Sequence, residues 1–334
     1  MTDTIDRRTA LAGASAVAAL SSAAMAQTTP ARPKYRVAVM RVPIEIPITA
    51  DALEATRQRN ATAMVEAIEN VMKGPDKPRI VVFPVLQYTS ARRAVSGVPM
   101  SAVAVDLSAE PLDKSIFAPV IAACRRHNCY VATSTQEKVA KLPGKFFHTG
   151  FIMGPEGLVL RSPKTQAQSA PEVFYLRDIA DQYKAIFGPQ SIMPVVDTPI
   201  GKLACYVEGE AEVLEVSRML VAKGAEVILH TSMESDETPW LALKQAIGFQ
   251  CHVFLLTGAT SKFLRADKPD VEWAGGAATI VGPDGKVLAI KGGQDEGAAI
   301  AEIDLAAIDE AKKKYGRNTV PAWGLYSDLY KDKG

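Results

Sequence analysis

Short apolar runs alternate with helix-like segments along the first half of the chain. Residues 35–40 and 79–83 are β-branched and apolar without interruption, which is typical of strands buried on both faces. Between them, apolar side chains recur at helical spacing over residues 53–71. A second helix-like segment over 116–127 and a strand-like run over 129–134 follow. The order β-α-β-α-β predicts an α/β layer architecture.

The first helix carries start and stop signals of its own. Asp51 is expected as the N-cap, and Glu54, three residues later, completes the pattern of a capping box. The sequence Lys73-Gly74-Pro75 supplies residue types that end helices. We therefore expect this helix to begin just after Asp51 and to end before Gly74.

The pattern changes to hairpins at two later points. Residues 146–161 contain two apolar runs around the turn Gly-Pro-Glu-Gly, and residues 277–290 repeat this design around Gly-Pro-Asp-Gly. Between the hairpins we expect a second alternating set, with strands at 203–207, 226–230 and 253–257 and helices at 210–223 and 240–251. A last strand over 299–303 and a charged helix over 305–313 complete the pattern.

Both halves of the chain thus run through α/β alternation and end in a Gly-Pro-acid-Gly hairpin. We interpret this as an internal duplication of one half-fold and not as a short solenoid repeat. Two packed sheets with helices outside would bury both sets of apolar strands. No linker-like composition separates the halves, so we predict one domain over 35–315 and a C-terminal tail over 316–334.

The N-terminus has the composition of a targeting segment. Arg7 and Arg8 precede an Ala-rich apolar run, and Ala-Met-Ala at 24–26 provides a cleavage site. The adjacent arginines indicate a signal peptide over 1–26 that the bacterial twin-arginine export machinery reads, followed by a linker over 27–34. The apolar run is shorter than the roughly 20 residues that span a bilayer, so we expect no stable membrane anchor. The mature protein is predicted to be periplasmic or secreted.

Composition and charge argue against several classes of function. The chain carries 38 basic and 37 acidic side chains, a net charge of +1, and no run of Lys and Arg interleaved with aromatic residues. This balance argues against nucleic acid as a partner. Four cysteines are too few for a disulfide scaffold, and Cys124 and Cys129 lack the paired spacing of a zinc site. We expect no structural metal and no cofactor, and whether Cys124 and Cys129 are oxidised stays open.

The stretch 200–212, IGKLACYVEGEAE, contains a thiol near the end of an apolar strand. A short apolar run, Leu203-Ala204, ends on Cys205 and a helix-like segment follows, so we expect the thiol to face the pocket. Strand ends open onto the ligand crevice of α/β sheets, and a nearby helix N-terminus or cation favours the nucleophilic thiolate. Glu208, Glu210 and Glu212 follow, and they suit a helix N-terminus. The alternative interpretation of Cys205 is a buried structural cysteine.

A series of short motifs follows a fixed order along residues 35–313. These motifs are VVFP at 81–84, GPEGLVLRSPK at 154–164, GKLACY at 201–206, GAEVILH at 224–230, QCHVFLLTGA at 250–259, GPDG at 282–285 and AEIDL at 301–305. Each motif alone is weak, but their order and spacing together are specific. By these motifs the chain resembles the nitrilase, or carbon–nitrogen hydrolase, superfamily. The resemblance implies a four-layer α-β-β-α sandwich with pseudo-twofold symmetry and assembly into a homodimer or higher homo-oligomer.

The resemblance also implies a chemistry and a set of site residues. Members of the superfamily use a Glu-Lys-Cys triad to cleave an amide, nitrile or carbamoyl C–N bond of a small molecule. Cys205 matches the nucleophile that forms a thioester, and Lys164 matches the lysine that stabilises the oxyanion. The backbone N–H of Tyr206 is the second expected oxyanion donor. The implied partner is a small-molecule amide or nitrile.

The glutamate of that triad is missing from this sequence. Where the family has Pro-Glu after the apolar strand, this chain has Pro84 followed by Val85. Valine can neither accept the thiol proton nor activate water, and loss of a general base costs about 10²–10⁴ in rate. Other polar positions also depart from the family: Val207 replaces an acidic residue, and His148 replaces an asparagine.

A replacement base can be sought among the other acidic and histidine residues. The candidates are Glu172, Glu208, Glu234, His148 and His230. Glu172 lies in the loop after Lys164, where some family members carry a second glutamate. The alternative interpretation makes Glu172 and Glu234 solvated loop carboxylates, and makes the two histidines packing or hydrogen-bonding residues.

Three hypotheses for the function follow. The first is an exported hydrolase that acts through Cys205 and Lys164 with an atypical base. The second is a catalytically inactive relative that binds a small ligand or a protein partner in the former active-site pocket. The third is a redox or thiol-transfer protein, which the absence of a Cys-x-x-Cys motif disfavours. Fold resemblance alone does not establish function, so the site has to decide between them.

Overall fold

The computed structural model describes residues 32–316 except 48, 76, 86–103, 107–115, 167–172, 235–236 and 266–267, together with Gly324 and Ser327. The helices and strands all lie within one unit, Pro33–Gly334. The predicted signal peptide falls outside the described residues, so it stays a prediction.

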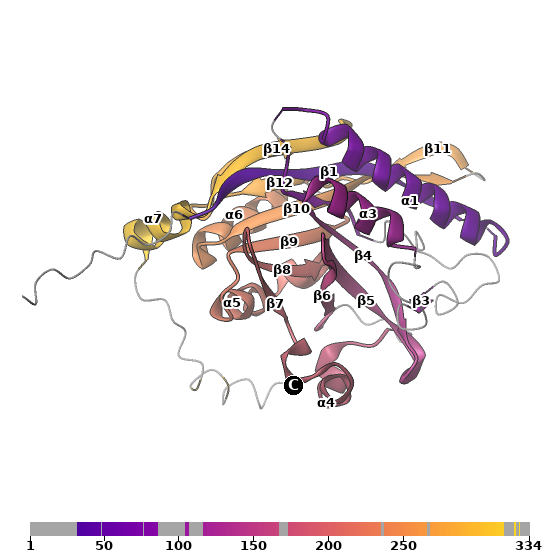
Figure 1. The fold of residues 1–334 in the computed structure, drawn as a ribbon, viewed down its shortest axis with the longest axis horizontal. Helices are drawn as coiled ribbons and strands as arrows, with labels where there is room; N and C mark the ends of the chain where they lie inside the picture. Colours follow the sequence, from indigo (N-terminus) through magenta and orange to yellow (C-terminus); the bar gives the residue numbers. More distant parts are fainter. Residues whose placement is uncertain are drawn as a thin grey trace, which may run out of the picture. The chain divides into compact units, whose positions relative to one another are not determined.

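Strands and helices alternate in the first half of this unit (Figure 1). The elements are β1 (Lys34–Ile46), α1 (Ala52–Val71), β2 (Ile80–Val82), β3 (Val105–Asp106), α3 (Ala118–His127), β4 (Tyr130–Val139), β5 (Leu142–Gly154) and β6 (Gly157–Pro163). The uninterrupted apolar run at β2 is buried throughout, as a strand covered on both faces requires.

The second half repeats this order after a connecting segment. The connection contains α4 (Leu176–Phe187), the 3₁₀ helix η2 (Pro189–Ser191) and β7 (Val195–Thr198). The repeat contains β8 (Gly201–Val207), the 3₁₀ helix η3 (Glu208–Glu212), α5 (Leu214–Ala222), β9 (Val227–Ser232), α6 (Glu237–Cys251), β10 (Phe254–Arg265), β12 (Ala278–Val281) and β13 (Val287–Lys291). The remaining elements are β11 (Lys268–Trp273), β14 (Gly297–Asp304) and α7 (Ala306–Tyr315).

Hydrogen bonds join the main strands in the order β6-β5-β4-β2-β1-β10-β9-β8-β7. In the first half β1, β2 and β4 run parallel, and β5 and β6 continue antiparallel. In the second half β8, β9 and β10 run parallel, and β12 and β13 continue antiparallel. Each half is therefore a parallel set of strands that ends in a hairpin, as the duplication predicts. β1 and β10 pair in parallel where the halves meet, with Arg41 opposite Ala259.

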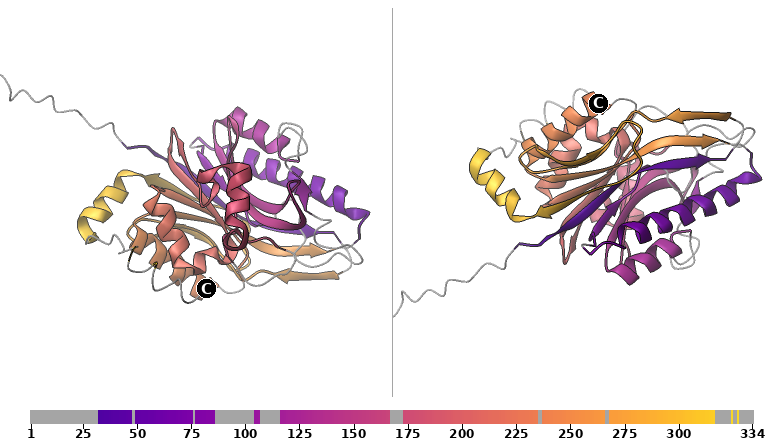
Figure 2. Two further views of the ribbon diagram at one scale, coloured as in Figure 1. Left: turned by 90° about the horizontal axis from the view of Figure 1, so that it is seen from below. Right: turned by 90° about the horizontal axis from the view of Figure 1, so that it is seen from above.

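The apolar side chains form an inner core between the two halves and an outer core under each pair of helices. The inner core includes Val39, Leu229 and Leu256, while the outer cores include Met64 and Ile121 on one side and Leu220 and Ile247 on the other. β5 and β6 lie against β8 across the inner core. Figure 2 shows α1 and α3 on one side of the strands and α5 and α6 on the other. This arrangement confirms the predicted four-layer α-β-β-α sandwich.

Helix α1 begins directly after Asp51 and ends before Gly74, as predicted. The backbone of Asp51 is helical (φ −66°, ψ −31°), however, and its side chain makes no cap hydrogen bond. One local prediction is wrong. The helix predicted over 210–223 is broken, since Val213 is extended and separates η3 from α5. The kinked helix α4 was not expected from the sequence.

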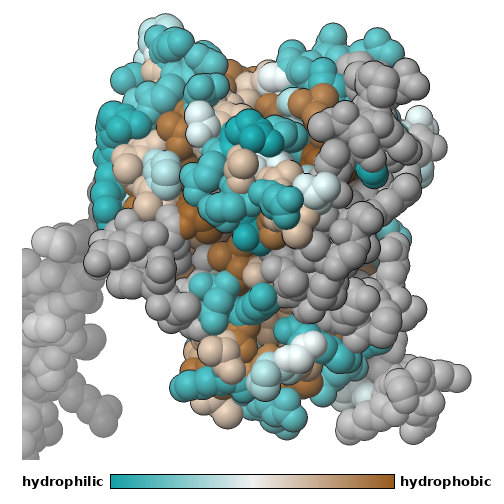
Figure 3. Space-filling view, turned by 90° about the vertical axis from the view of Figure 1, so that its right-hand side faces the viewer, coloured by the Kyte–Doolittle hydropathy of each residue, from teal (hydrophilic) through white to brown (hydrophobic). Residues whose placement is uncertain are grey.

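The surface carries both hydrophobic and hydrophilic residues. Figure 3 shows hydrophobic residues between hydrophilic ones on the end of the molecule that lies at the right of Figure 1. Among the helices of the described residues, none combines the length and the apolar composition needed to cross a membrane.

Candidate active site

A lysine and a glutamate meet where two strands of opposite halves end. Lys164 directly follows β6, and Glu208 directly follows β8. Lys164 Nζ donates a hydrogen bond of 2.7 Å to Glu208 Oε2, and the two side chains are 8% and 19% exposed. His148 on β5 lies beside them, with Nδ1 3.8 Å from the same carboxylate oxygen. The sandwich thus brings together three of the residues that sequence analysis selected.

The backbone of Glu208 adopts a strained conformation. Its φ is +48°, in the left-handed region that non-glycine residues rarely adopt. His230 on β9 holds this turn, because Nε2 lies 3.0 Å from the carbonyl oxygen of Glu208. The other ring nitrogen, Nδ1, lies 3.2 Å from Thr257 Oγ1. Strained residues of this kind cluster at functional sites, where the surrounding structure maintains them.

The contacts and the pKa of His230 suit a hydrogen-bonding role better than the role of a base. Burial, helped by the charge of Lys244, lowers the pKa of His230 to about 3. The ring is therefore neutral near pH 7 and has one N–H. If Nε2 donates to the Glu208 carbonyl, Nδ1 accepts a hydrogen bond from the Thr257 hydroxyl, and both ring nitrogens are satisfied.

A second glutamate fastens the lysine segment to the same strand end. Glu210 Oε1 accepts hydrogen bonds from the backbone N–H of Thr165 at 2.7 Å and from its hydroxyl at 2.6 Å. Its other oxygen accepts from the N–H of Val207 at 3.3 Å. Burial raises the pKa of Glu210, against the effect of these donors. Lys164–Glu208 and Thr165–Glu210 are thus neighbouring bridges between the halves of the sandwich.

Opposing effects act on the ionisation of Glu208. Burial alone would raise the pKa of its carboxyl, but Lys164 and His148 outweigh burial and hold that pKa well below the usual range of glutamate. Glu208 is therefore an ionised carboxylate at neutral pH. A carboxylate with so low a pKa accepts hydrogen bonds but is a weak general base.

Cys205 lies apart from this pair. It stands inside β8, two residues before the strand ends, and its side chain is 0% exposed in the core between the halves. A Cβ built on Gly150 of β5 would lie 2.7 Å from Cys205 Sγ, so the thiol packs directly on that strand. Burial, and secondarily Glu210, raise the pKa of the thiol. The expectation that Cys205 faces the pocket beside Lys164 is not met, because β8 continues through two more apolar residues before it ends.

The other predicted members of the triad region occupy apolar surroundings. Tyr206 lies opposite His230 within the parallel β8–β9 ladder, so its N–H is not at a strand end. The Val85 side chain is fully buried and packs with Val207 and the partly buried Met233. This apolar cluster lies beside the strand end that carries Glu208.

The remaining candidate bases do not join this group. Glu234 forms a buried ion pair with Lys244, with Nζ 2.7 Å from Oε1. Lys244 Nζ also donates to the carbonyl oxygen of Ala277 at 3.1 Å. Glu234 is thus a buried, paired residue and not a solvated loop carboxylate. Glu172 lies outside the described residues.

The cysteines and the possible metal ligands can be described for the part of the chain that the structure covers. All four cysteines are free thiols there. No group of three His, Cys, Asp or Glu side chains in the described residues is arranged to hold a metal ion.

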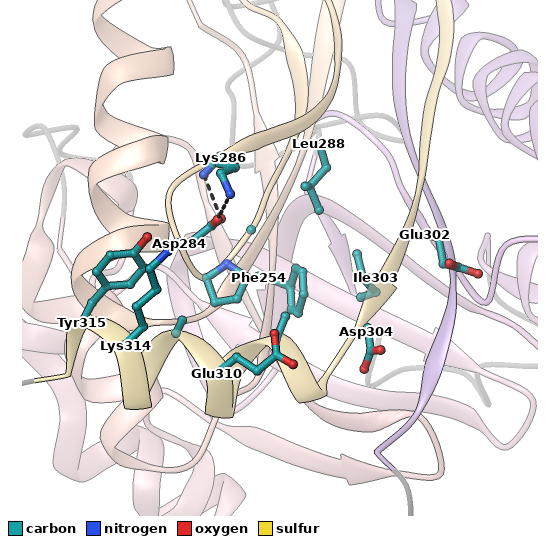
Figure 4. A pocket seen from close by; sticks show the side chains of 14 residues that line it. Phe254, Asp284, Lys286, Leu288, Glu302, Ile303, Asp304, Glu310, Lys314 and Tyr315 are labelled. Atoms are coloured by element: carbon teal, nitrogen blue, oxygen red, sulfur yellow. Dashed lines mark hydrogen bonds and ion pairs between the residues drawn. The ribbon is translucent and has the colours of Figure 1, made fainter.

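A cavity of about 390 Å³ opens at a different place, between α7 and the turn of the second hairpin. Phe254 and Ile303 contribute apolar side chains, while Asp284 and Lys286 form an ion pair of 2.7 Å in its lining (Figure 4). Its lining shares no residue with the Lys164–Glu208 pair, so it is a separate feature.

Known proteins share both this sequence pattern and this fold. The family model "Carbon-nitrogen hydrolase" matches residues 36–313. Nitrilase 2 of Arabidopsis thaliana is 30% identical over 141 residues, which cover 37% of this chain and 41% of that relative. The bifunctional nitrilase/nitrile hydratase NIT4A of Lupinus angustifolius is 28% identical over 143 residues, 38% of this chain and 40% of the relative. The matched segments thus span about two fifths of these relatives.

Solved structures share the fold at low sequence identity. Nit3 of Saccharomyces cerevisiae, described as a member of branch 10 of the nitrilase superfamily, has a TM-score of 0.64 at 17% identity, covering 87% of this chain and 97% of that one. A carbon-nitrogen hydrolase from Helicobacter pylori G27 has a TM-score of 0.65 at 17% identity, covering 89% and 98%.

The fold, the ordered motifs and the family match agree. This chain belongs to the carbon-nitrogen hydrolase family. Family membership supports C–N bond hydrolysis as the general class of chemistry, and the particular activity has to be argued from the residues of this site.

Glu208 was predicted as a candidate base, and it lies at the strand end beside Lys164. The nucleophile role at this strand end was expected for Cys205, and the bridge from Thr165 to Glu210 was not predicted. One signal was present: Tyr206 and Val207 are apolar and prolong the strand beyond the cysteine. The Thr165–Glu210 bridge joins residues 45 positions apart and has no local signal.

Proposed function

We propose that this chain binds a small amide or nitrile at the Lys164–Glu208 site without forming a thioester on Cys205. The observation that carries the proposal is the 2.7 Å pair of Lys164 and Glu208 at the end of β8. A carboxylate occupies the strand end where a nucleophilic thiol was expected. The thiol itself is buried with a raised pKa, so little of it is thiolate.

The lack of a base beside the thiol supports the same conclusion. Val85 stands where the resemblance expects the catalytic glutamate, and its neighbours Val207 and Met233 are apolar. Removal of a general base lowers rates by about 10²–10⁴. The pair keeps polar groups for recognition, while the groups that a covalent mechanism needs are absent from these positions.

Hydrolysis of the bound C–N compound is the second candidate function. It is favoured by the family match over residues 36–313 and by the position of Lys164 directly after β6. On this alternative Cys205 attacks the substrate, and the site has to open enough to expose the thiol. The two candidate functions predict different protein masses after incubation with the compound: hydrolysis through Cys205 adds an acyl group to the protein, and non-covalent binding does not.

Titration calorimetry and intact-protein mass spectrometry with a panel of small amides, nitriles and carbamoyl compounds test the proposal. The proposal predicts saturable binding, equal in the wild type and in Cys205→Ala, and no covalent mass increase. An acyl adduct on the wild type that disappears in Cys205→Ala would establish the hydrolase instead. Failure of every compound to bind would also refute the proposal.

We further propose that the precursor is exported through the twin-arginine route and that the mature chain forms a homo-oligomer. The export proposal is supported by Arg7 and Arg8, which precede the apolar run. The proposed homo-oligomer is supported by the resemblance to the superfamily. Arg7→Lys combined with Arg8→Lys should leave the precursor in the cytoplasm, and unchanged export would contradict the route. Light scattering on the mature protein measures the oligomeric state.

A further inference from the structure

The Lys164–Glu208 pair leaves hydrogen-bonding capacity unused. Oε2 of Glu208 takes the hydrogen bond from Lys164 and is the oxygen near His148. Of the residues that the structure describes, none donates to Oε1 of Glu208. The Lys164 ammonium has three donors, and Glu208 is the one described side chain or backbone group that accepts from it. The pair therefore offers a ligand one carboxylate acceptor and ammonium donors side by side.

The hydrogen-bonding groups of a ligand decide how well it matches this arrangement of acceptor and donors. A primary amide or urea presents a carbonyl oxygen next to an N–H₂ group, so one planar group can accept from Lys164 and donate to Glu208. A nitrile has an acceptor nitrogen but no donor, and it would leave Oε1 unsatisfied. A carboxylate would repel Glu208, and an ammonium ion would repel Lys164. Unpaired polar groups in a site are the strongest basis for discrimination between similar ligands.

We infer that Glu208 is a specificity-determining residue, whose Oε1 favours neutral ligands with an N–H donor beside a carbonyl over nitriles. The inference rests on the proposed binding function of the pair. It separates this chain from the matched relatives, which are named for nitriles. Glu208 comes from the strand end of one half and Lys164 from the strand end of the other, so both halves contribute one contact.

The two contacts are held in place before a ligand arrives. His230 fixes the carbonyl of Glu208 at 3.0 Å, and Glu210 fixes Thr165, the neighbour of Lys164, through hydrogen bonds of 2.7 and 2.6 Å. Buried groups set the position of each residue, so little ordering is required when a ligand binds. Preorganisation of this kind favours affinity for groups of matching geometry.

A matched ligand series on the unmodified protein tests the inference. The compounds are propionamide, N,N-dimethylpropionamide, propionitrile and propionate, with dissociation constants measured by calorimetry or ligand-observed NMR. We expect propionamide to bind about tenfold or more tightly than the other three, as one charge-assisted hydrogen bond implies. Equal or tighter binding of propionitrile overturns the inference but leaves the proposed binding function standing. Absence of binding by all four overturns both.

Two variants test whether Glu208 causes the preference for propionamide over propionitrile. Glu208→Gln removes the carboxylate and should reduce the preference for propionamide over propionitrile by about tenfold. Glu212→Gln changes an exposed residue of the same 3₁₀ helix and should retain the preference. A preference that survives in Glu208→Gln overturns the inference. The ligand series does not depend on either variant folding.

Discussion

Removal of the Glu208 carboxylate should destabilise the protein and should do so through Lys164. The pair is joined at 2.7 Å, and its side chains are 8% and 19% exposed. Breaking a fully buried ion pair costs about 3–5 kcal/mol because a charge is left unpaired. Some solvent reaches both groups here, so we expect about 2 kcal/mol of unfolding free energy for Glu208→Gln, the middle of the range for hydrogen bonds to charged groups.

A double-mutant cycle isolates this contribution. The variants are Glu208→Gln, Lys164→Met and the two together, with Glu212→Gln as the matched control, and the assay is urea unfolding followed by circular dichroism. Because each single change removes the same interaction, their effects should not add, and the coupling energy should be about 1 kcal/mol or more. The Glu212→Gln control should stay within about 0.5 kcal/mol of the wild type.

The pH dependence of the free energy of unfolding gives a second measure of the Lys164–Glu208 interaction. Lys164 and His148 hold the folded-state pKa of Glu208 below its unfolded value. The carboxylate therefore contributes stability above the unfolded pKa of about 4.3, and that stability is lost as the pH falls further toward the folded pKa. Wild type and Glu208→Gln should converge in stability in this acidic range. Additive single effects, or a constant difference between the two proteins from pH 7 down to acid, would refute the reasoning.

Three further predictions address the thiol, the strand end and the buried histidine. Gly150→Ala should lower the free energy of unfolding by about 1–3 kcal/mol, because its Cβ would lie 2.7 Å from Cys205 Sγ, and adding Cys205→Ala should recover most of that loss in urea melts. The double variant with Val85→Glu and Glu208→Cys should release ammonia from a primary amide faster than the wild type. The single variant Val85→Glu should not, because the native thiol is not at the strand end. His230 has a folded pKa lowered to about 3, so wild-type stability should fall as the pH drops from about 6.5 toward 3, and His230→Gln should flatten that slope in pH-dependent urea melts.

The fold could be predicted because its information is local and repeated. Strands buried on both faces read as uninterrupted apolar runs such as 79–83, and the Gly-Pro-acid-Gly turns mark both hairpins. Their order in each half predicts the duplication that the sheet topology bears out. Asp51 shows the limit of such signals, since a residue type suited to an N-cap is held in a helical backbone.

The site could be predicted only in part because its geometry depends on where strands end. Cys205 and Glu208 are three positions apart, and the resemblance gave the nucleophile role to Cys205 although the apolar pattern predicts a strand that runs on to residue 207. The structure ends β8 at Val207. That boundary leaves the thiol in the core and brings Glu208 to Lys164, which is 44 residues away in the sequence.

A crystal structure of the protein soaked with propionamide would test the central claim most directly. We predict the amide nitrogen within hydrogen-bonding distance of Glu208 Oε1 and the amide oxygen within hydrogen-bonding distance of Lys164 Nζ, with Cys205 still buried and unmodified. A propionyl group bonded to Cys205 Sγ would contradict the account.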